Sequence, residues 1–577
     1  MASSSSGSSP KSAARDSIDD PTRVKVSSGS GNSQAQASRP GADPSRALLL
    51  PFDSLMQAYG TAGPSATQAR TLRSGLADGS LLTGLRQQFE RSAGLSGAVI
   101  NSPAVQTLLG AQVTRLDRQL GGLWAAPRAG VINLGGTPYT IGLSAGSTGI
   151  GLAVNSRRTL TGPQLLIGAG PTAPVTGVWA SSRLTGDGAN QIVLGSGLLA
   201  GAVVTPDARV SLGAGADALL GHGIGTGVAN QGEIDLGAGA DRLIGSALFT
   251  GVLNTGRLRL DGDLPVNPSG AQDDDLLGIG AFSGIANLGS IDASAGSDSL
   301  IGASAGTGVL NGVGARISLG AGRDLIAGGG LGMAVQALQP GRRAGAGLPE
   351  AVRTQFGSVL APYASESAAE GGLVNFGAID TGDQDDIVYA TGTMAAVTPE
   401  TTAIRTFTAQ FGPYDGVALV NRAGAELKTG DGNDLVLAAT VANDGSIDLG
   451  NGRDALLAPD GFSGTGTVRF GDGDDALLGF GTGRFDFGSG IDALGLPAGS
   501  YRVRRGERQS IDITRQGNTA VMRTWNLETV NGVRIGALLT RPEGVFTVGT
   551  AAGQVPLPGG STFDIAARTA SVNALLV

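Results

Sequence analysis

The sequence predicts an all-β fold, a parallel β-solenoid of the β-helix or β-roll kind with a small N-terminal helical region and a C-terminal β cap. Composition is the first reason. Of the 577 residues, 98 are glycine and only 4% are aromatic, whereas ordinary globular domains hold about 7% glycine. Many glycines, plentiful Val, Ile and Leu and few aromatic residues are typical of short strands and tight turns built by repetition.

A repeated unit is the second reason. The unit reads N-x-G-x-[IL]-x-[LT]-G-x-G-x-D-x-[LI]-[LI]-[GA], and residues 230–245 are its clearest copy. Its acidic residue recurs at intervals of 24, 33, 24, 26, 62, 48, 20, 21 and 17 residues, so the base period is near 24 with insertions. Self-similarity at such a period indicates a solenoid. The acidic positions are Asp217, Asp241, Asp274, Asp298, Asp324, Asp386, Asp434, Asp454, Asp475 and Asp492, with Asn190 in the matching place of an earlier copy.

Each unit is long enough for one coil of two or three strands. Residues 233–236 alternate between polar and apolar side chains, which is the period of a strand. The Gly-x-Gly segment that follows allows a tight turn with positive φ, and Leu243 and Ile244 begin the next strand. Stacked coils would form parallel sheets with Val, Ile and Leu inside.

Composition and periodicity also divide the rest of the chain. The first residues are rich in Ser, Gly and Pro and show no periodicity, which is typical of disorder. Alternating runs near Tyr501 and Ile511 predict a β cap, because the end of a solenoid exposes strand edges. The predicted regions are a disordered tail at 1–45, a helical region at 46–128, the solenoid at 129–495 with insertions at 331–370 and 391–415, the cap at 496–545 and a tail with a secretion signal at 546–577.

The helical region contains an apolar stripe at helical spacing. Ser102 is its predicted N-cap and Pro103 its first helical residue. We interpret the region as a small helical bundle or a solenoid cap, and a helix that binds a partner is the alternative. The stripe consists of Val105, Leu108, Leu109, Val113, Leu116 and Leu120.

Ionisable residues exclude several classes of protein. The chain has no cysteine, which excludes disulfides, thiolate zinc sites and cysteine nucleophiles. Its single histidine, His222, cannot supply a histidine-rich metal site, and the flanking glycines predict a solvent-facing turn there. The net charge of −8 argues against nucleic acid as a partner. Residues 371–495 hold 18 acidic and 6 basic residues, so this acidic array suits cations.

The sequence predicts neither an N-terminal signal peptide nor a transmembrane segment. Polar, serine-rich residues follow Met1, so no N-terminal signal peptide is predicted. The uncharged segments 129–156 and 159–182 are rich in Gly, Ser, Thr and Pro, so no transmembrane segment is predicted either.

The Gly-x-Gly-x-Asp element is the strongest chemical signal. Calcium takes six to eight oxygen ligands at about 2.3–2.6 Å and mixes carboxylates with backbone carbonyls. A Gly-x-Gly turn exposes carbonyls without obstruction by side chains, and the Asp adds charge. Stacked coils place one such turn above the next, so calcium ions would lie between neighbouring turns.

Three copies fit this element most closely, at residues 429–435, 450–456 and 470–477. They resemble the nonapeptide repeats, G-G-x-G-x-D-x-U-x, of the RTX (haemolysin-type calcium-binding) family. The resemblance implies a bacterial protein that is secreted or held at the cell surface by type I secretion, through an uncleaved C-terminal signal such as residues 563–577. Residues 525–530 also resemble the module that commonly follows such repeats. The calcium ligands expected on this basis are Asp217, Asp241, Asp386, Asp431, Asp434, Asp454, Asp472, Asp475 and Asp492.

The repeats depart from the family pattern in spacing and in charge. Single motifs recur about every 24 residues, not every nine. In upstream copies such as residues 213–217, alanine fills positions where aspartate would add charge. We therefore expect ion sites to be densest at residues 430–492. For the upstream motifs, the alternative to a calcium site is a structural turn in which Asp caps its own backbone.

These observations favour an exported calcium-binding repeat protein with a structural, surface or adhesive role, cell-surface polysaccharide as a partner, and calcium coupled to folding of the repeats. The alternative is a carbohydrate-active β-helix, a polysaccharide lyase or hydrolase, with Asp472, Asp474 and Asp475 as its carboxylates. A pore-forming toxin ranks last. Residues 142–146 and 302–306 match the G-x-S-x-G nucleophile elbow, but so many Gly and Ser residues produce such matches by chance.

Overall fold

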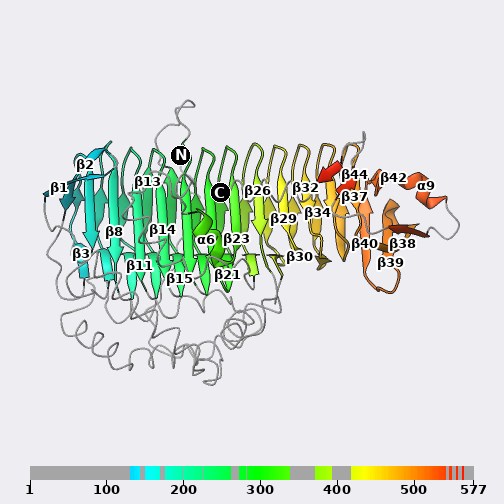
Figure 1. Ribbon diagram of the computed structural model, residues 1–577, viewed down its shortest axis with the longest axis horizontal. Coiled ribbons are helices and arrows are strands. Elements are labelled where there is room, and N and C mark those ends of the chain that lie inside the picture. Colours follow the sequence, from blue (N-terminus) through cyan, green and yellow to red (C-terminus); the bar gives the residue numbers. More distant parts are fainter. Residues whose placement is uncertain are drawn as a thin grey trace, which may run out of the picture. The chain divides into compact units, whose positions relative to one another are not determined.

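The described part of the chain is a three-sided parallel β-solenoid (Figure 1). The tail at 1–45, the helical region at 46–128 and most of the tail at 546–577 lie outside it, as do residues 338–370 and 393–416. The computed structural model describes residues 130–134, 136–142, 150–168, 176–197, 199–223, 225–247, 249–261, 272–280, 282–337, 371–392, 417–540, 545–548, 554–556 and 562–564.

Each complete coil contributes one strand to each of three sheets, A, B and C. Sheet A runs in the order β1 (Gly130–Leu134), β2 (Thr137–Gly142), β5 (Gln164–Gly168), β8 (Gln191–Ser196), β11 (Ala218–Gly223), β14 (Arg242–Ala247), β17 (Asp275–Gly280), β20 (Ser299–Ser304), β23 (Leu325–Gly329), β26 (Ile387–Ala390), β29 (Leu435–Ala438), β32 (Ala455–Leu457), β35 (Ala476–Leu478), β37 (Ala493–Gly495), β41 (Thr529–Val530), β42 (Val533–Arg534). Sheet B runs in the order β3 (Ile150–Val154), β6 (Thr176–Ala180), β9 (Ala200–Val204), β12 (Thr226–Asn230), β15 (Thr250–Asn254), β18 (Ser283–Asn287), β21 (Thr307–Asn311), β24 (Gly371–Asn375), β27 (Leu419–Asn421), β30 (Thr440–Asn443), β33 (Gly461–Ser463).

Sheet C continues beyond the coils into antiparallel strands. It runs in the order β4 (Arg158–Thr159), β7 (Arg183–Thr185), β10 (Arg209–Ser211), β13 (Glu233–Gly237), β16 (Arg257–Asp261), β19 (Ser290–Asp292), β22 (Arg316–Ser318), β25 (Ala378–Asp380), β28 (Glu426–Lys428), β31 (Ser446–Asp448), β34 (Thr467–Arg469), β36 (Gly483–Asp486), β40 (Val521–Trp525), β39 (Ile511–Arg515), β38 (Gly499–Arg505), β43 (Val545–Val548). The remaining described elements are α6 (Leu331–Ala337), the 3-10 helix η5 (Glu507–Gln509), α9 (Ile535–Leu539), β44 (Gln554–Pro556) and β45 (Thr562–Asp564).

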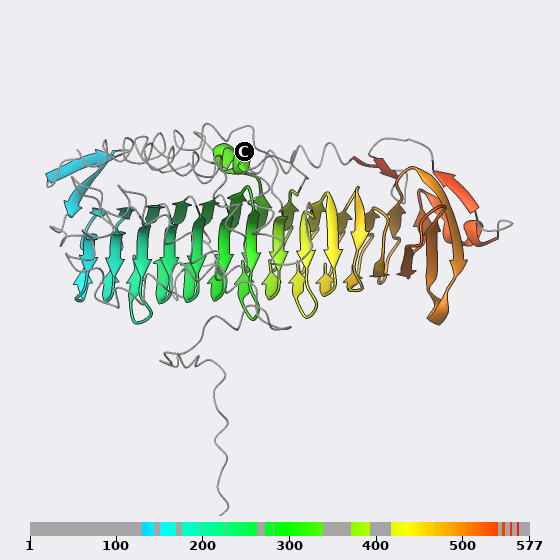
Figure 2. The same cartoon turned by 90° about the horizontal axis from the view of Figure 1, so that it is seen from below.

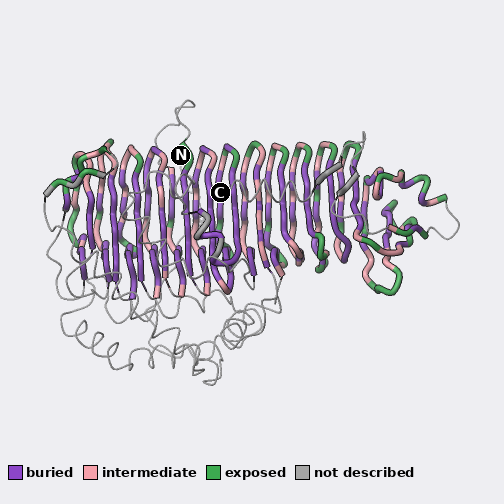
Figure 3. Tube along the Cα trace, in the orientation of Figure 1, coloured by how far each residue is buried: buried purple, intermediate pink, exposed green. Residues whose placement is uncertain are grey.

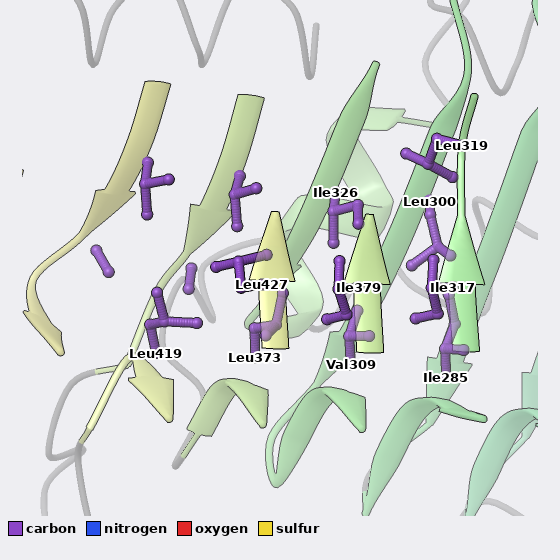
Figure 4. Close-up of a cluster of buried hydrophobic side chains, with 14 of the residues drawn as sticks. Ile285, Leu300, Val309, Ile317, Leu319, Ile326, Leu373, Ile379, Leu419 and Leu427 are labelled. Atoms are coloured by element: carbon purple, nitrogen blue, oxygen red, sulfur yellow. The ribbon is translucent and has the colours of Figure 1, made fainter. Parts of the chain in front are cut away.

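Stacked rows of aliphatic side chains fill the coil. The sheets are in register, so that Val210 of β10 lies beside Ile234 of β13, and Ile234 beside Leu258 of β16. All three are buried, and each such side chain stabilises the fold by about 1.5–3 kcal/mol. The core residues labelled in Figure 4 are Ile285, Leu300, Val309, Ile317, Leu319, Ile326, Leu373, Ile379, Leu419 and Leu427.

The outer faces of the sheets differ. Sheet C presents polar residues, among them Arg209, which pairs with Asp235 at 2.7 Å and with Glu233 at 3.4 Å. Sheets A and B carry a second apolar layer on their outer faces, where Leu220 of sheet A and Leu253 of sheet B are buried in clusters apart from the core. The expectation that Val, Ile and Leu lie inside the coil therefore covers only one of the two apolar layers.

The coils shorten toward the C-terminal end. Sheet B ends at β33, whereas sheets A and C continue. The 17-residue interval between Asp475 and Asp492 reflects this change, because that coil forms β35 in sheet A and β36 in sheet C. Phe470 and Phe487 stack inside this end with ring centroids 4.7 Å apart.

The strands β38 to β40 cap the coil. They are antiparallel to one another, and β40 pairs in parallel with β36, so the cap extends sheet C (Figure 2). The β41 strand likewise extends sheet A beside β37. The two stretches expected to interrupt the period fall between β23 and β24 and between β26 and β27. Within the described residues, no helix is long and apolar enough to cross a membrane.

Candidate functional site: the corner aspartate ladder

The Gly-x-Gly-x-Asp segments form the corners between sheet C and sheet A. In one coil the corner joins β13 to β14, with φ of +111° at Gly237 and +148° at Gly239. A Cβ atom on Gly239 would lie 1.7 Å from the carbonyl oxygen of Gly215 in the preceding coil. Backbone conformation and close stacking therefore both require glycine at this corner.

The aspartate that ends each corner joins one coil to the next. The backbone N–H of Asp217 donates to Oδ1 of Asp241 at 2.7 Å, and the N–H of Asp241 donates to Oδ1 of Asp274 at 2.7 Å. The same bond continues through every later corner at 2.7–2.9 Å. The members of this corner ladder, all at most 2% exposed, are Asp217, Asp241, Asp274, Asp298, Asp324, Asp386, Asp434, Asp454, Asp475 and Asp492.

The second carboxylate oxygen of these residues is different. In nine of the ten, Oδ2 is buried and accepts no hydrogen bond from the described part of the chain. A buried polar atom without a partner is unfavourable unless something neutralises it. The residues with such an oxygen are Asp217, Asp241, Asp274, Asp298, Asp386, Asp434, Asp454, Asp475 and Asp492.

Burial dominates the titration of the ladder. It raises the pKa of Asp217 to about 9, and the neighbouring Asp241 carboxylate adds to this effect. Burial also raises the pKa of Asp274 to about 10. It raises the pKa of Asp454 to about 8, although the hydrogen bond from the N–H of Asp434 opposes the shift. These three carboxylates therefore favour a proton, or a cation in its place.

Two residues outside the repeat end the ladder. At one end the N–H of Gln191 donates to Oδ1 of Asp217. The register of β8 and β11 thus places Gln191, and not Asn190, opposite Asp217, so the expected position of Asn190 in the repeat is wrong by one residue. At the other end the N–H of Asp492 donates to Oε2 of Glu528 at 2.9 Å. Glu528 belongs to the segment that follows the repeats.

The nine expected ligands divide between two rows. Seven of them lie in the buried ladder, but Asp431 and Asp472 lie at the exposed middle position of the Gly-x-Gly segment. Oδ1 of Asp431 accepts a hydrogen bond from Asn451 at 2.7 Å, and Oδ1 of Asp472 accepts one from Ser489 at 2.6 Å. The upstream and downstream corners both contain the buried ladder. They differ at the exposed middle position of the Gly-x-Gly segment, where an upstream corner has Ala238 in place of an aspartate.

A second ladder, of asparagines, was not predicted as a separate feature. Nδ2 of Asn230 donates to Oδ1 of Asn254 at 2.9 Å and to the carbonyl of Arg257 at 2.8 Å. The pattern links the coils between sheets B and C. It passes through Asn230, Asn254, Asn287, Asn311, Asn375, Asn421 and Asn443. The asparagine of the repeat motif was its sequence signal.

The expected position of His222 is wrong. His222 lies within β11 and is 9% exposed, and burial lowers its pKa to about 4. Its neighbour Gly221 is required because a Cβ atom there would lie 2.1 Å from the carbonyl oxygen of Gly227 in sheet B. Ser304 of one G-x-S-x-G match lies in β20, three strands of sheet A away, which is about 14 Å. These two side chains are therefore not within hydrogen-bond reach.

Fold and site together define a parallel β-solenoid protein whose corners carry a continuous column of carboxylates. Comparison with protein-family models, with curated proteins and with solved structures found no match. Within the described residues, no three His, Asp or Glu side chains gather closely enough to hold a metal ion by themselves. A metal at the corners would need backbone oxygens as well.

Proposed function

We propose that the protein is an exported calcium-binding repeat protein with a structural, surface or adhesive role, in which calcium binding is coupled to folding of the coils. The observation that carries the proposal is the row of nine buried Oδ2 atoms named above, which accept no hydrogen bond from described residues. Buried carboxylate oxygens require a positive partner or a proton. A cation at each corner would meet this requirement along the whole column.

The donor set at the corners suits calcium. Calcium prefers oxygen and accepts backbone carbonyls beside one or two carboxylates. The Gly-x-Gly turns stack directly on one another. A Cβ on Gly452 would lie 1.5 Å from the Gly432 carbonyl oxygen and 3.3 Å from Oδ1 of Asp454, so this carbonyl lies near the carboxylate of the corner. In the most closely spaced coils, the residues that would hold calcium are Gly432, Asp434, Gly452, Asp454, Gly473 and Asp475.

Coupling to folding follows from the stacking. Each corner belongs to one coil, and the column exists only when the coils are in register. An ion that binds the stacked corners but not the unfolded chain stabilises the folded state by RT ln(1 + [Ca²⁺]/Kd). Bound calcium supplies the charge that neutralises the ladder. Export rests on the RTX-like motifs and on the resemblance of the C-terminal tail to an uncleaved signal.

The test is a calcium titration of the EDTA-treated full chain, followed by calorimetry and by thermal melting. We expect saturable heat and a rise in Tm of several degrees at millimolar calcium, with a smaller effect of magnesium. The double variant Asp454→Asn/Asp475→Asn should lose part of both effects. The control Asp448→Asn/Asp460→Asn removes the same charge outside the ladder and should retain them. Absence of heat and of any change in Tm would refute the proposal.

A further inference from the structure

Sheet A has an outer apolar face that the corner chemistry does not use. Side chains along a strand alternate, so Leu219 of β11 joins the core while Leu220 joins a separate cluster. The register continues this second row, since Leu220 lies beside Leu194 of β8 and Ile244 of β14. We use the name outer apolar face for Leu165, Ile167, Ile192, Leu194, Leu220, Ile244, Leu277 and Ile301.

This face is buried. Leu220 and Ile244 are fully buried and Leu194 is 4% exposed. Exposed residues lie instead at the turns between strands and in the cap (Figure 3). Contiguous apolar surface of this extent is rare on a monomer unless another element covers it. The face therefore needs an occupant.

Among the described elements outside the coil, α6 and β44 lie against the coiled part of sheet A. The α6 helix packs on β17 and β20, and its Leu331 and Met333 join the same cluster as Leu277. The β44 strand lies against β37 near the other end of the sheet. Segments of the same chain thus cover parts of sheet A. The strands β5, β8, β11 and β14 precede the part that α6 covers.

We propose that residues 103–120 pack as an amphipathic helix on the outer apolar face over β5 to β14. Val105, Leu109, Leu116 and Leu120, at the centre of the apolar stripe, would contact the sheet, and the polar residues of the segment would face water. The occupant is thus the chain's own predicted helix. This inference does not depend on calcium.

The lengths agree. A helix of 18 residues is about 27 Å long. Five strand spacings separate β2 from β17, which is about 24 Å at 4.8 Å each. The helix would therefore reach from the first strands of sheet A to the edge of α6.

The linker between the predicted helix and β1 is also compatible with this position of the helix. Nine residues separate Leu120 from Gly130, where β1 begins, and β1 pairs with β2 in sheet A. A linker of that length spans at most about 34 Å. It holds the segment near the outer apolar face at an effective concentration in the millimolar range.

The test measures the accessibility of a single thiol in the full chain, which has no cysteine of its own. Ser196→Cys places a nearly isosteric probe on β8, where Ser196 is 1% exposed and follows Leu194 on the outer side. Ser463→Cys is the control probe, because Ser463 is exposed on β33. Each probe is combined with Leu109→Glu/Leu116→Glu in the stripe, or with Thr107→Glu/Thr114→Glu on the opposite side of the predicted helix.

We expect the thiol of Ser196→Cys to react with a disulfide reagent at least 10-fold faster when Leu109→Glu/Leu116→Glu is present, at every protein concentration. Thr107→Glu/Thr114→Glu should leave the rate unchanged, and the Ser463→Cys probe should react at the same rate in all backgrounds. Circular dichroism should show the same β content throughout.

Other outcomes would overturn the proposal and identify another occupant. Protection that survives Leu109→Glu/Leu116→Glu would assign the cover to a different segment. Protection that grows with protein concentration would assign it to a second copy of the chain. Protection that appears only with phospholipid vesicles would assign it to a lipid surface, and rapid reaction in every variant would mean an open face.

Discussion

The backbone N–H of Asp454 donates a hydrogen bond to Oδ1 of Asp475 at 2.8 Å. Oδ2 of the same Asp475 is buried and accepts no hydrogen bond from described residues. One oxygen of this carboxylate thus joins neighbouring coils, and the other is left for a proton or a cation. The structural role and the proposed ion-binding role therefore belong to the same side chain and can be separated by substitution.

The substitution Asp475→Ala should destabilise the protein by about 1–3 kcal/mol, because the buried N–H of Asp454 loses its acceptor. Asp475→Asn retains an oxygen acceptor and removes the charge, so it should cost less. Urea unfolding in EDTA at pH 8 measures both. An equal loss in the two variants would show that the hydrogen bond contributes little.

The stability of the calcium-free protein should fall as pH rises. Burial raises the pKa of Asp454 to about 8 and that of Asp475 to about 6, above the usual value of 3.8. Between these limits the folded state binds more protons than the unfolded state, so these groups contribute full stability below about pH 4 and lose it as pH rises through 6 to 8. Melting in EDTA at pH 5 and pH 8 should show a larger decline for the wild type than for Asp454→Asn/Asp475→Asn. A decline of the same size in both proteins would contradict the ladder titration.

The substitution Gly452→Ala should destabilise the coil by about 2–4 kcal/mol. Gly452 has φ of +148°, and an added Cβ would overlap the carbonyl oxygen of Gly432. Gly188→Ala is the matched control, because an added Cβ there meets nothing within 4 Å. Thermal or urea unfolding should show a change within about 0.5 kcal/mol for the control. Similar losses in both variants would argue against close stacking of the corners.

The substitution Asn311→Ala should cost about 2–3 kcal/mol. Asn311 donates to Asn375 at 2.9 Å and to the carbonyl of Ala378 at 3.0 Å, and it is fully buried. Asn451→Ala removes an exposed asparagine that bonds Asp431, so its cost should be about 0.5 kcal/mol or less. Urea unfolding of the two variants compares them, and a negligible effect of Asn311→Ala would show that the asparagine ladder is dispensable.

The solenoid and its corners were predictable because each coil repeats the same local chemistry. The alternation of residues 233–236 and the glycines at 237 and 239 predict β13 and the corner after it without any knowledge of distant residues. The predicted acidic residues from Asp217 to Asp492 occupy one column for the same reason. Because every coil repeats the same local sequence, equivalent residues of successive coils lie beside one another.

The outer apolar face was missed because alternation is not the rule in sheet A. The pair Leu219 and Leu220 places one side chain in the core and the next on the outer face. A strand covered on both faces has a continuous apolar run in its sequence. The apolar doublets near the start of β11, β14 and β17 carried this signal.

Two other features depend on register or on distant contacts. From the sequence alone, the glycines that flank His222 predict a turn. In the structure, Gly221 lies in a strand and is required because sheet B approaches it closely. Glu528 ends the ladder 36 residues after Asp492, beyond the strands of the cap, so no period leads to it. Only the three-dimensional arrangement brings such residues together.

The central claim is that the buried oxygens of the corner ladder hold calcium. A crystal structure determined in millimolar calcium, with anomalous diffraction recorded for that element, tests it most directly. We expect anomalous peaks at successive corners, about 2.3–2.6 Å from Oδ2 of Asp434, Asp454 and Asp475. The same column of coils with no anomalous peak at any corner would contradict the claim.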